Sequence, residues 1–379
     1  MLPPIRIALH AAAGLLLGGC AAAEPTTAGA GGPRFESPFT VAATTIESAG
    51  RVFDARLYAP APETATGAGV VLIGGGMSND LDWSVPGFLE IDGERTQVTI
   101  SGEGHADAPR LAKAFASRGA VVMHWSTIAR DDPKRDRYPY EATLLTMDEL
   151  VAQANAAIAA VRDVPGVDPD RIMLVGQSLG GYRAAGIAMT DVGVSGLVLI
   201  GSAQLARTGP EQPHRSVHDG PARERIAAHD ANGDGALGRD EATDEDLAAR
   251  FDAIDFDGDG VIRLWELAAD AARTARAALS LSDEGPPARD DWGGSYWTED
   301  VIVARAIPTL IVYGALDNAQ ARHAPIIAER IQSAGATHAT LVVLPGLGHT
   351  MGLERDGHIG PFHETALVVI GSWFRTTGG

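Results

Sequence analysis

The chain has 379 residues, of which 45% are hydrophobic and 21% are charged, an ordinary globular composition with room for one large domain and an extra module. Its 49 acidic and 30 basic residues give a net charge of −19, which argues against nucleic acid as a partner because phosphate binding needs a basic surface. The single cysteine, Cys20, excludes a disulfide within the chain.

The N-terminal segment predicts export. Residues 1–20 run from Arg6 into an Ala/Leu-rich stretch that ends in Gly19-Cys20, which is too short for a membrane-spanning helix and typical of a secretory signal peptide. This ending resembles the lipobox of bacterial lipoproteins, in which cleavage leaves a cysteine that is then acylated; a plain signal peptide with an incidental cysteine is the alternative. The resemblance implies a lipid-anchored protein of the bacterial cell envelope, on the periplasmic or outer surface side, that contacts the membrane through Cys20.

Most of the remaining chain alternates between strands and helices. Residues 21–38 are rich in Pro and Gly and predict a flexible tether, and 39–60 predict a hairpin. The predicted strands are 69–73, 97–100 (beside a hairpin turn at 91–94), 120–125, 172–175, 196–200, 309–313 and 340–344, and the predicted helices are 107–118, 147–162, 182–189, 325–333 and 364–374. This pattern predicts an α/β fold with a doubly wound, mostly parallel sheet.

The alternation of strands and helices stops near residue 204 and resumes about a hundred residues later. We therefore expect a core in two parts, 39–204 and 301–379, separated by an inserted module over 205–300.

One short motif suits nucleophilic catalysis. Gly176-Gln177-Ser178-Leu179-Gly180 matches G-x-S-x-G and lies between a predicted buried strand and a predicted helix. A sharp turn between the two elements would lift the hydroxyl of Ser178 above the edge of the sheet. The motif therefore marks Ser178 as the candidate nucleophile, with an ordinary glycine turn as the alternative.

A serine nucleophile needs a base that is itself oriented by a carboxylate. Asp317 follows the predicted strand 309–313, and His349 follows the strand 340–344, in the chain order Ser, acid, His. Other histidines fit this pattern less well, because they precede a strand or lie beyond the loop: His338, His358 and His363. We therefore predict that His349 accepts the proton of Ser178 and that Asp317 holds His349.

The oxyanion of an acyl transfer needs two backbone N–H donors. One is expected from Leu179, directly after the nucleophile. The other is expected from the glycines that follow strand 69–73, where we favour Gly75 over Gly76. A glycine turn without a catalytic role is the alternative.

With these motifs the chain resembles the α/β-hydrolase superfamily over residues 69–204 and 301–376, and within it esterases and dienelactone-hydrolase-like members. The resemblance implies a serine hydrolase that cleaves a small-molecule carboxylic ester through an acyl-enzyme, without a redox or organic cofactor. One departure concerns the oxyanion loop, where many relatives have His-Gly and this chain has Ile73-Gly74.

The inserted module contains two twelve-residue loops, 230–241 and 255–266, that match the calcium loop D-x-[DN]-x-[DN]-G-x₅-E. Here the chain resembles EF-hands, which implies two Ca²⁺ sites built from oxygen donors, including the main-chain carbonyls of Ala236 and Val261. The predicted ligands are Asp230, Asn232, Asp234, Ala236 and Glu241 in the first loop and Asp255, Asp257, Asp259, Val261 and Glu266 in the second. An acidic stretch that binds no ion is the alternative.

Three further expectations concern this pair of loops. Leu237 and Ile262 should pair across them, one helix over 242–254 should join them, and Arg263, at position 9, cannot act as a ligand. A permanently loaded structural clip is expected rather than a sensor.

The position of the insertion is typical of a cap, and we hypothesise that calcium orders a lid over Ser178. Four aromatic residues either line that lid or pack its small core, and core packing is the favoured interpretation: Trp265, Trp292, Tyr296 and Trp297.

The sequence thus predicts a membrane-anchored serine hydrolase with a calcium-loaded cap. Two alternatives remain open: a calcium-dependent binding or adhesion protein on an inactive hydrolase scaffold, and an acyltransferase that excludes water. The sequence does not indicate the acyl group or the oligomeric state.

Overall fold

The computed structural model describes residues 39–75, 79–84, 86–91, 94–99, 107–132, 145–202, 219–270, 298–317, 320–355 and 358–377. The predicted signal segment with Cys20 and the predicted tether lie outside these residues, as do Trp292, Tyr296 and Trp297. Within the described part of the chain, no helix combines the length and the apolar character that crossing a bilayer requires.

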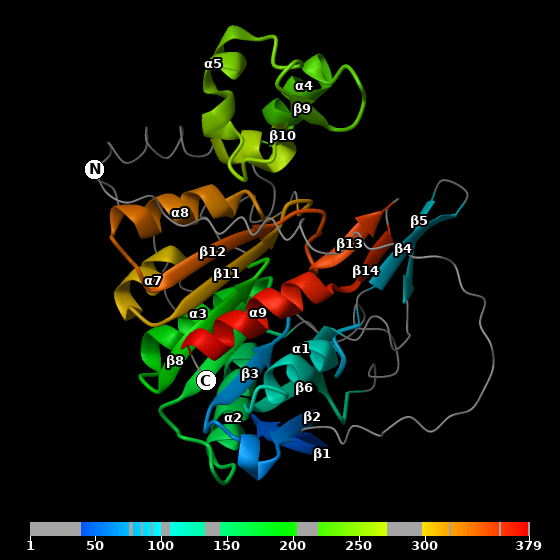
Figure 1. Cartoon of the computed structure of the whole chain (residues 1–379). Coiled ribbons are helices and arrows are strands. Elements are labelled where there is room, and N and C mark those ends of the chain that lie inside the picture. The colour runs from blue at the N-terminus through cyan, green and yellow to red at the C-terminus, as the bar shows by residue number, and fades with distance from the viewer. Residues whose placement is uncertain are drawn as a thin grey trace, which may run out of the picture.

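An eight-stranded sheet with the order β1-β2-β6-β3-β7-β8-β11-β12 forms the centre of the molecule (Figure 1). The antiparallel edge consists of β1 (Phe39–Ser48), β2 (Arg51–Pro60) and its neighbour β6 (Val121–Ala129). The parallel part continues with β3 (Gly69–Ile73), β7 (Ile172–Gln177), β8 (Val194–Ile200), β11 (Thr309–Gly314) and β12 (Ala339–Leu344). The predicted doubly wound, mostly parallel sheet is confirmed, and its strand order is that of the α/β-hydrolase fold.

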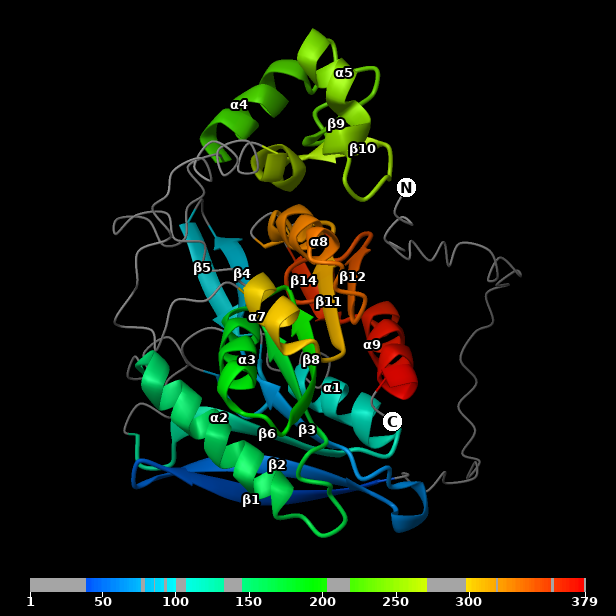
Figure 2. The ribbon, with the colours of Figure 1, turned by 90° about the vertical axis from the view of Figure 1, so that its left-hand side faces the viewer.

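Helices cover both faces of this sheet (Figure 2). One face carries α1 (Asp107–Ala116) and α9 (Glu364–Thr377), and the other carries α2 (Met147–Arg162), α3 (Leu179–Thr190), α7 (Thr298–Arg305) and α8 (His323–Ser333). Successive residues of a strand point to opposite faces, so Val70 and Leu72 pack in the hydrophobic cluster beneath α1 and α9, while Val71 and Ile73 pack in the cluster on the other face. The parallel part of the sheet is therefore buried on both sides, which explains its unbroken apolar strands.

The inserted module lies beyond α8, at the opposite end of the molecule from β1 and β2 (Figures 1 and 2). Its elements are α4 (Asp219–His229), β9 (Ala236–Gly238), α5 (Glu245–Ile254), β10 (Val261–Arg263) and a helical stretch over residues 264–270. A core of its own includes Leu237, Leu247 and Phe251. The chain leaves the sheet after β8 and returns to it at β11, and these two strands are hydrogen-bonded neighbours.

Two predicted boundaries need correction. The helix between the calcium-type loops begins at Glu245 rather than at residue 242, because the side chain of Asp244 accepts hydrogen bonds from the amides of Asp246 and Leu247 and so caps the helix there. At the end of the insertion, α7 begins at Thr298 and crosses the predicted boundary between residues 300 and 301. Its Ile302 is buried in the core of the sheet domain.

Three small elements complete the fold. A short 3₁₀ helix, η1 (Pro62–Thr64), follows β2. The hairpin expected around residues 91–94 is formed by β4 (Pro86–Ile91) and β5 (Glu94–Thr99). A second hairpin, β13 (Gly352–Arg355) and β14 (His358–Phe362), directly follows the loop of His349 and was not expected from the sequence.

Candidate active site

Ser178 occupies a strained turn between β7 and α3. Its backbone angles are φ +53° and ψ −123°, a region that residues with a side chain rarely adopt and that concentrates at functional sites. The turn is closed so tightly that a Cβ atom on Gly180 would lie 2.1 Å from the carbonyl oxygen of Ile73. The amide of Ser178 donates a hydrogen bond of 2.9 Å to the carbonyl of Ile200 at the end of β8. The serine is therefore presented at the carboxyl end of the parallel strands.

Asp317 and His349 meet at the same end of the sheet. The imidazole Nδ1 of His349 lies 2.7 Å from Oδ2 of Asp317, and because an ionised carboxylate only accepts, the ring donates. The remaining ring nitrogen, Nε2, is then the one that can accept a proton. The side chain of Asp317 is 1% exposed and that of His349 is 34% exposed, so the carboxylate is buried while the base can be reached.

A backbone hydrogen bond joins the turn that carries Asp317 to the loop that carries His349. Leu316 donates its amide to the carbonyl of Leu347, and Asp317 donates its amide to the carbonyl of Gly314. Beside them, a Cβ atom on Gly201 would lie 2.8 Å from the carbonyl oxygen of His349 and 3.5 Å from Oδ2 of Asp317. Gly201 directly follows Ile200, the residue to which the amide of Ser178 is bonded, so the structure brings the three predicted residues to one corner of the sheet.

No hydrogen bond joins the hydroxyl of Ser178 to His349 among the described residues. Hydrogen bonds of this kind are often long before a substrate is bound and shorten in the Michaelis complex. Proton transfer therefore requires the imidazole or the hydroxyl to move into hydrogen-bonding distance of the other.

The predicted oxyanion donors flank Ser178. A Cβ atom on Gly75 would lie 2.9 Å from the Cβ atom of Ser178, so the Gly75 backbone packs directly against the serine. Leu179 is the first residue of α3, and its amide belongs to the N-terminal donors that a helix does not satisfy itself. The carbonyl of Gly75 accepts a hydrogen bond from the side chain of Asn79, which fixes the peptide. Gly76, the alternative, lies outside the described residues.

Arg183 is a residue of this site that sequence reasoning missed. Its guanidinium donates through Nη2 to the carbonyl of Gly74, on the peptide that leads into Gly75. The side chain is almost completely buried, and this burial lowers its pKa to about 10, so it stays charged at neutral pH. A single cation within an otherwise Ala/Gly-rich helix was the available signal, because arginine is seldom buried without a specific contact.

The competing histidines have other partners. Nε2 of His338 lies 2.8 Å from the carbonyl oxygen of Ile302, and Nδ1 of His363 accepts a hydrogen bond of 3.2 Å from the amide of Thr365 at the start of α9. The side chain of His358 lies outside the described residues. Within the described part of the chain, His349 is thus the histidine that contacts Asp317.

The two twelve-residue loops have donor sets that suit a hard divalent cation. In the second loop, carboxylate oxygens of Asp255, Asp257 and Asp259 lie within 4.8 Å of one another, and Oδ1 of Asp255 is buried without a hydrogen-bond partner in the described part of the chain. The loops pair through β9 and β10, which places Leu237 opposite Ile262 as predicted, with both side chains fully buried.

Burial and the neighbouring acids favour a bound cation at the second loop. Burial, with the charges of Asp257 and Asp255 added, raises the pKa of Glu266 to about 8. Burial together with the charge of Asp259 raises the pKa of Asp257 to about 6. A divalent cation would stabilise the ionised forms of these carboxyl groups. Arg263 does not point away from the loop, since its Nη1 pairs with Oδ2 of Asp259 at 2.5 Å.

Trp265 corrects a further expectation. The favoured interpretation of the sequence packs it in the small core of the inserted module, but its fully buried ring belongs to the hydrophobic cluster of the sheet domain. Its Nε1 donates a hydrogen bond of 2.9 Å to the carbonyl oxygen of Ala315. The module is therefore docked on the turn that carries Asp317.

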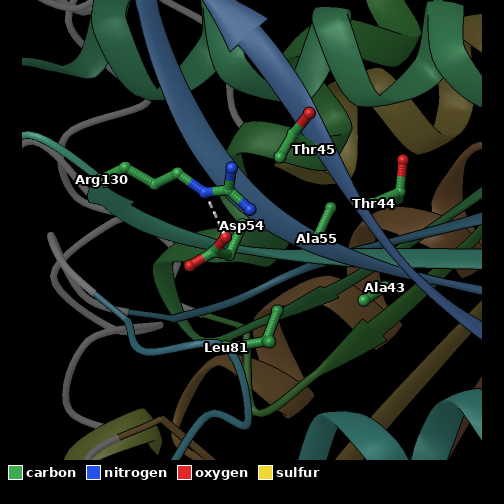
Figure 3. Close-up of a pocket in the computed structure, with 7 residues that line it drawn as sticks. All are labelled: Ala43, Thr44, Thr45, Asp54, Ala55, Leu81 and Arg130. Carbon is green, nitrogen blue, oxygen red and sulfur yellow. Dashed lines mark hydrogen bonds and ion pairs between the residues drawn. The ribbon is translucent and has the colours of Figure 1, made fainter.

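A surface hollow of about 300 Å³ lies at the antiparallel edge of the sheet (Figure 3). Its lining includes an ion pair in which Nε of Arg130 donates to Asp54 over 2.6 Å. The lining residues are Ala43, Thr44, Thr45, Asp54, Ala55, Leu81 and Arg130, and none of them is a predicted catalytic residue. We assign this hollow no role in catalysis.

Solved structures of several hydrolases resemble this chain. An esterase from Pyrococcus furiosus is 12% identical, with a TM-score of 0.46 over 94% of this chain and 97% of its own. A carboxyl esterase from the fungus Tuber melanosporum is 15% identical, with a TM-score of 0.47 over 92% and 89%. A dienelactone hydrolase-like promiscuous phosphotriesterase from metagenomic libraries is 10% identical, with a TM-score of 0.45 over 90% and 100%.

No protein-family model and no curated protein matches the sequence. Because every one of these TM-scores lies below 0.5, we base no functional conclusion on the structural resemblances. The functional assignment rests on the geometry around Ser178, Asp317 and His349.

Proposed function

We propose that this protein is a serine hydrolase that cleaves a small-molecule carboxylic ester through an acyl-enzyme intermediate. One observation carries the proposal: a serine held at a strained strand-to-helix turn shares a corner of the sheet with a histidine that is hydrogen-bonded to a buried aspartate. A strained backbone and a buried carboxylate both cost stability, and their coincidence with a histidine at one sheet edge is typical of an active site.

In the acylation step, Oγ of Ser178 attacks the ester carbonyl carbon while its proton passes to Nε2 of His349. The buried carboxylate of Asp317 keeps the imidazole in the required tautomer and stabilises the imidazolium that forms. The negative charge on the carbonyl oxygen is stabilised by the amides of Leu179 and Gly75. The C–O bond of the ester then breaks, and the proton on His349 is transferred to the departing alkoxide.

Deacylation repeats these steps with water in place of the serine. His349 removes a proton from a water molecule, the resulting hydroxide attacks the acyl carbon, and the proton returns to Ser178 as the carboxylic acid leaves. Arg183 donates to the carbonyl of Gly74 and Asn79 to that of Gly75, and their contribution is to hold these peptides in place. An acyltransferase would use the same residues with an alcohol in place of the water.

Calcium binding by the two loops and membrane anchoring through Cys20 are part of this proposal. Asp230, Asn232, Asp234, Glu241 and the carbonyl of Ala236 would hold one Ca²⁺, and Asp255, Asp257, Asp259, Glu266 and the carbonyl of Val261 would hold the other. Bound Ca²⁺ supplies charge neutralisation and fixes the shape of each loop. Acylation of Cys20 would hold the protein stably on a membrane of the cell envelope, since several acyl chains act together.

Labelling with a fluorophosphonate probe tests the catalytic proposal. The wild-type protein should form a covalent adduct on Ser178, and Ser178→Ala should lose both the adduct and the hydrolysis of short-chain esters. Ser195→Ala is a matched control, because its hydroxyl bonds the carbonyl of Ile172 away from the site and its loss should leave labelling unchanged. A wild-type protein that is calcium-loaded but never labelled would favour the binding-protein alternative instead.

Product analysis and lipid labelling test the remaining parts. Supplying an alcohol acceptor distinguishes transfer from hydrolysis, and a panel of esters with varied chain length identifies the acyl group. Metabolic incorporation of a fatty acid should occur in the full-length chain and be absent from Cys20→Ser. Incorporation that persists in Cys20→Ser would remove the anchoring proposal while leaving the catalytic one intact.

A further inference from the structure

Trp265 connects the second calcium-type loop with the catalytic turn. It occupies position 11 of that loop, directly before Glu266, and lies outside the module's own core. Its ring is fully buried in the sheet domain and meets the ring of Phe256 edge to face, with 6.2 Å between the ring centroids. Two residues of one calcium-type loop thus form the docking contact with the sheet domain.

The contact reaches the peptide two residues before Asp317. The indole Nε1 of Trp265 donates to the carbonyl of Ala315 at 2.9 Å, while the amide of Ala315 donates to the carbonyl of Leu344 at the end of β12. The next residue, Leu316, donates to Leu347 in the loop that leads to His349. A shift of Trp265 would therefore disturb the segment that sets the distance between Asp317 and His349.

The other end of the connection is the carboxylate of Glu266. Its Oε1 accepts a hydrogen bond of 2.8 Å from the amide of Phe256, and its Oε2 accepts one of 2.7 Å from the amide of Arg263. The side chain that closes the loop around a cation therefore also fixes the backbone at Phe256 and Arg263, in the loop segment that leads to Trp265. The first loop offers no such connection, because its position 11 is Asp240, which is exposed.

We propose that Trp265 is a positioning residue through which an ordered, cation-filled second loop holds Asp317 in its hydrogen bond with His349. The inference rests on the proposed hydrolase function and adds a regulatory input to it. Calcium then acts through the turn that carries Asp317, and keeps the carboxylate of that residue oriented, in place of ordering the lid over Ser178 that the sequence suggested. The first loop stabilises the module and, among the described residues, is linked to this contact through its pairing with the second.

Trp265→Phe tests this coupling and Trp125→Phe is its matched control. Both changes keep an aromatic ring in the same buried cluster and remove one indole hydrogen bond, which in Trp125 goes to Gln153 at 3.1 Å. We expect Trp265→Phe to lower kcat about three- to tenfold, the effect of one buried hydrogen bond, with KM unchanged. Trp125→Phe should change kcat less than about twofold, since its indole bonds Gln153 and not the turn of Asp317.

Three further readouts separate positioning from a structural role. The midpoint of the rise of kcat with pH should move to lower pH in Trp265→Phe and stay in place in Trp125→Phe, because a misaligned Asp317 stabilises the imidazolium less. The downfield NMR signal of the proton on Nδ1 of His349 should weaken when the wild-type protein is stripped of calcium with EGTA. The calcium-dependent part of the tryptophan emission should be lost in Trp265→Phe and retained in Trp125→Phe.

Glu266→Gln, compared with Glu241→Gln, provides a second arm that leaves the indole in place. At limiting calcium, Glu266→Gln should reproduce the shift in the pH profile and Glu241→Gln should not. Equal behaviour of the two tryptophan variants, or a His349 signal that ignores calcium, overturns the coupling. A wild-type protein that is never labelled at Ser178 overturns the hydrolase function instead, and the NMR and emission readouts still decide the coupling.

Discussion

The two twelve-residue loops of the inserted module share a ligand pattern but differ in their surroundings. Ala231 and Asn232 of the first loop are exposed, whereas the corresponding Phe256 and Asp257 of the second are half-buried and buried; the closing glutamates are buried in both loops. Position 9 is Gly238 in one and Arg263 in the other, and position 11 is Asp240 in one and Trp265 in the other. The ligand positions define which ion each loop can bind. The residues between them, such as those at positions 9 and 11, define which neighbouring part of the protein responds to the bound ion.

Under the proposed coupling, the two loops have separate roles although they are paired in one small sheet. Leu237 and Ile262 pair between β9 and β10, so the loops support each other. Only the second of them, among the described residues, places a side chain against the turn of Asp317. Variants at corresponding positions of the two loops therefore test whether the loops differ in this way.

The largest difference is expected at position 11. Trp265→Ala would leave a cavity in the core of the sheet domain and should lower the free energy of unfolding by about 3–5 kcal/mol. Asp240→Ala changes an exposed side chain and should stay within about 0.5 kcal/mol. Chemical denaturation at saturating calcium measures both, and similar values for the two variants would contradict the docking of Trp265.

The hairpin that follows His349 is held by Asp107, and the stability contributed by this residue should depend on pH and not on calcium. Oδ1 of Asp107 accepts a hydrogen bond of 3.0 Å from the amide of Phe362 at the end of β14, and burial raises the pKa of this carboxyl group to about 7. An unfolded aspartate has a pKa near 3.9, so the folded state is stabilised below about pH 4 and loses this stabilisation as pH rises towards about 7.

Asp107→Asn should abolish that dependence. The stability gained by the variant over the wild type should grow from pH 4 to pH 8, reaching at most about 4 kcal/mol, since one pKa unit corresponds to about 1.36 kcal/mol. Denaturation curves at several pH values, with calcium and with EGTA, measure it. A difference that changes with calcium rather than with pH would show that Asp107 belongs to the same coupling as Trp265.

Position 12 should separate affinity from function. Glu241→Gln and Glu266→Gln each remove the carboxylate that closes a loop, and each should weaken calcium binding at its own site at least about tenfold, or about 1.4 kcal/mol. Calorimetric titration measures this. Slower labelling of Ser178 at limiting calcium is expected for Glu266→Gln alone, and an equal slowing in both variants would assign the coupling to the module as a whole.

Position 9 should give the smallest effect. Arg263→Gln removes a positive charge that pairs with Asp259, and the calcium affinity of the second loop should rise about fivefold, from a charge interaction of about 1 kcal/mol. Arg239→Gln is the control, because Arg239 pairs with Asp252 outside the ligand set. An affinity that does not rise in Arg263→Gln would mean that Arg263 leaves the loop when the cation binds.

Much of this architecture could be predicted because the signals are local. The strand–turn–helix around Ser178 and the spacing of acids in residues 230–241 are each contained in about a dozen residues. The pairing of Leu237 with Ile262 follows from the same spacing and is present in the structure. The order of Ser178, Asp317 and His349 along the chain was sufficient to place them at one edge of a parallel sheet.

Features that depend on long-range packing could not be predicted. The β13–β14 hairpin lies over residues with no clear alternation, and its last amide is held by Asp107 from far earlier in the chain. The partner of Trp265 is fifty positions away, and only the docking of the module selects it. The burial of Arg183 contradicts the usual preference of its residue type, so composition argued against it.

The insertion begins and ends at adjacent strands of the sheet. Leu197–Ile200 of β8 and Thr309–Val312 of β11 are direct neighbours, so the hydrolase sheet holds both ends of the module together. Since the entropy of closing a loop grows only with the logarithm of its length, this junction tolerates a guest domain of almost any size. Under the proposed coupling, an inserted domain affects catalysis through a single side chain that bonds the turn of Asp317. Other domains inserted at the same junction would need only one such side chain to affect the same carboxylate.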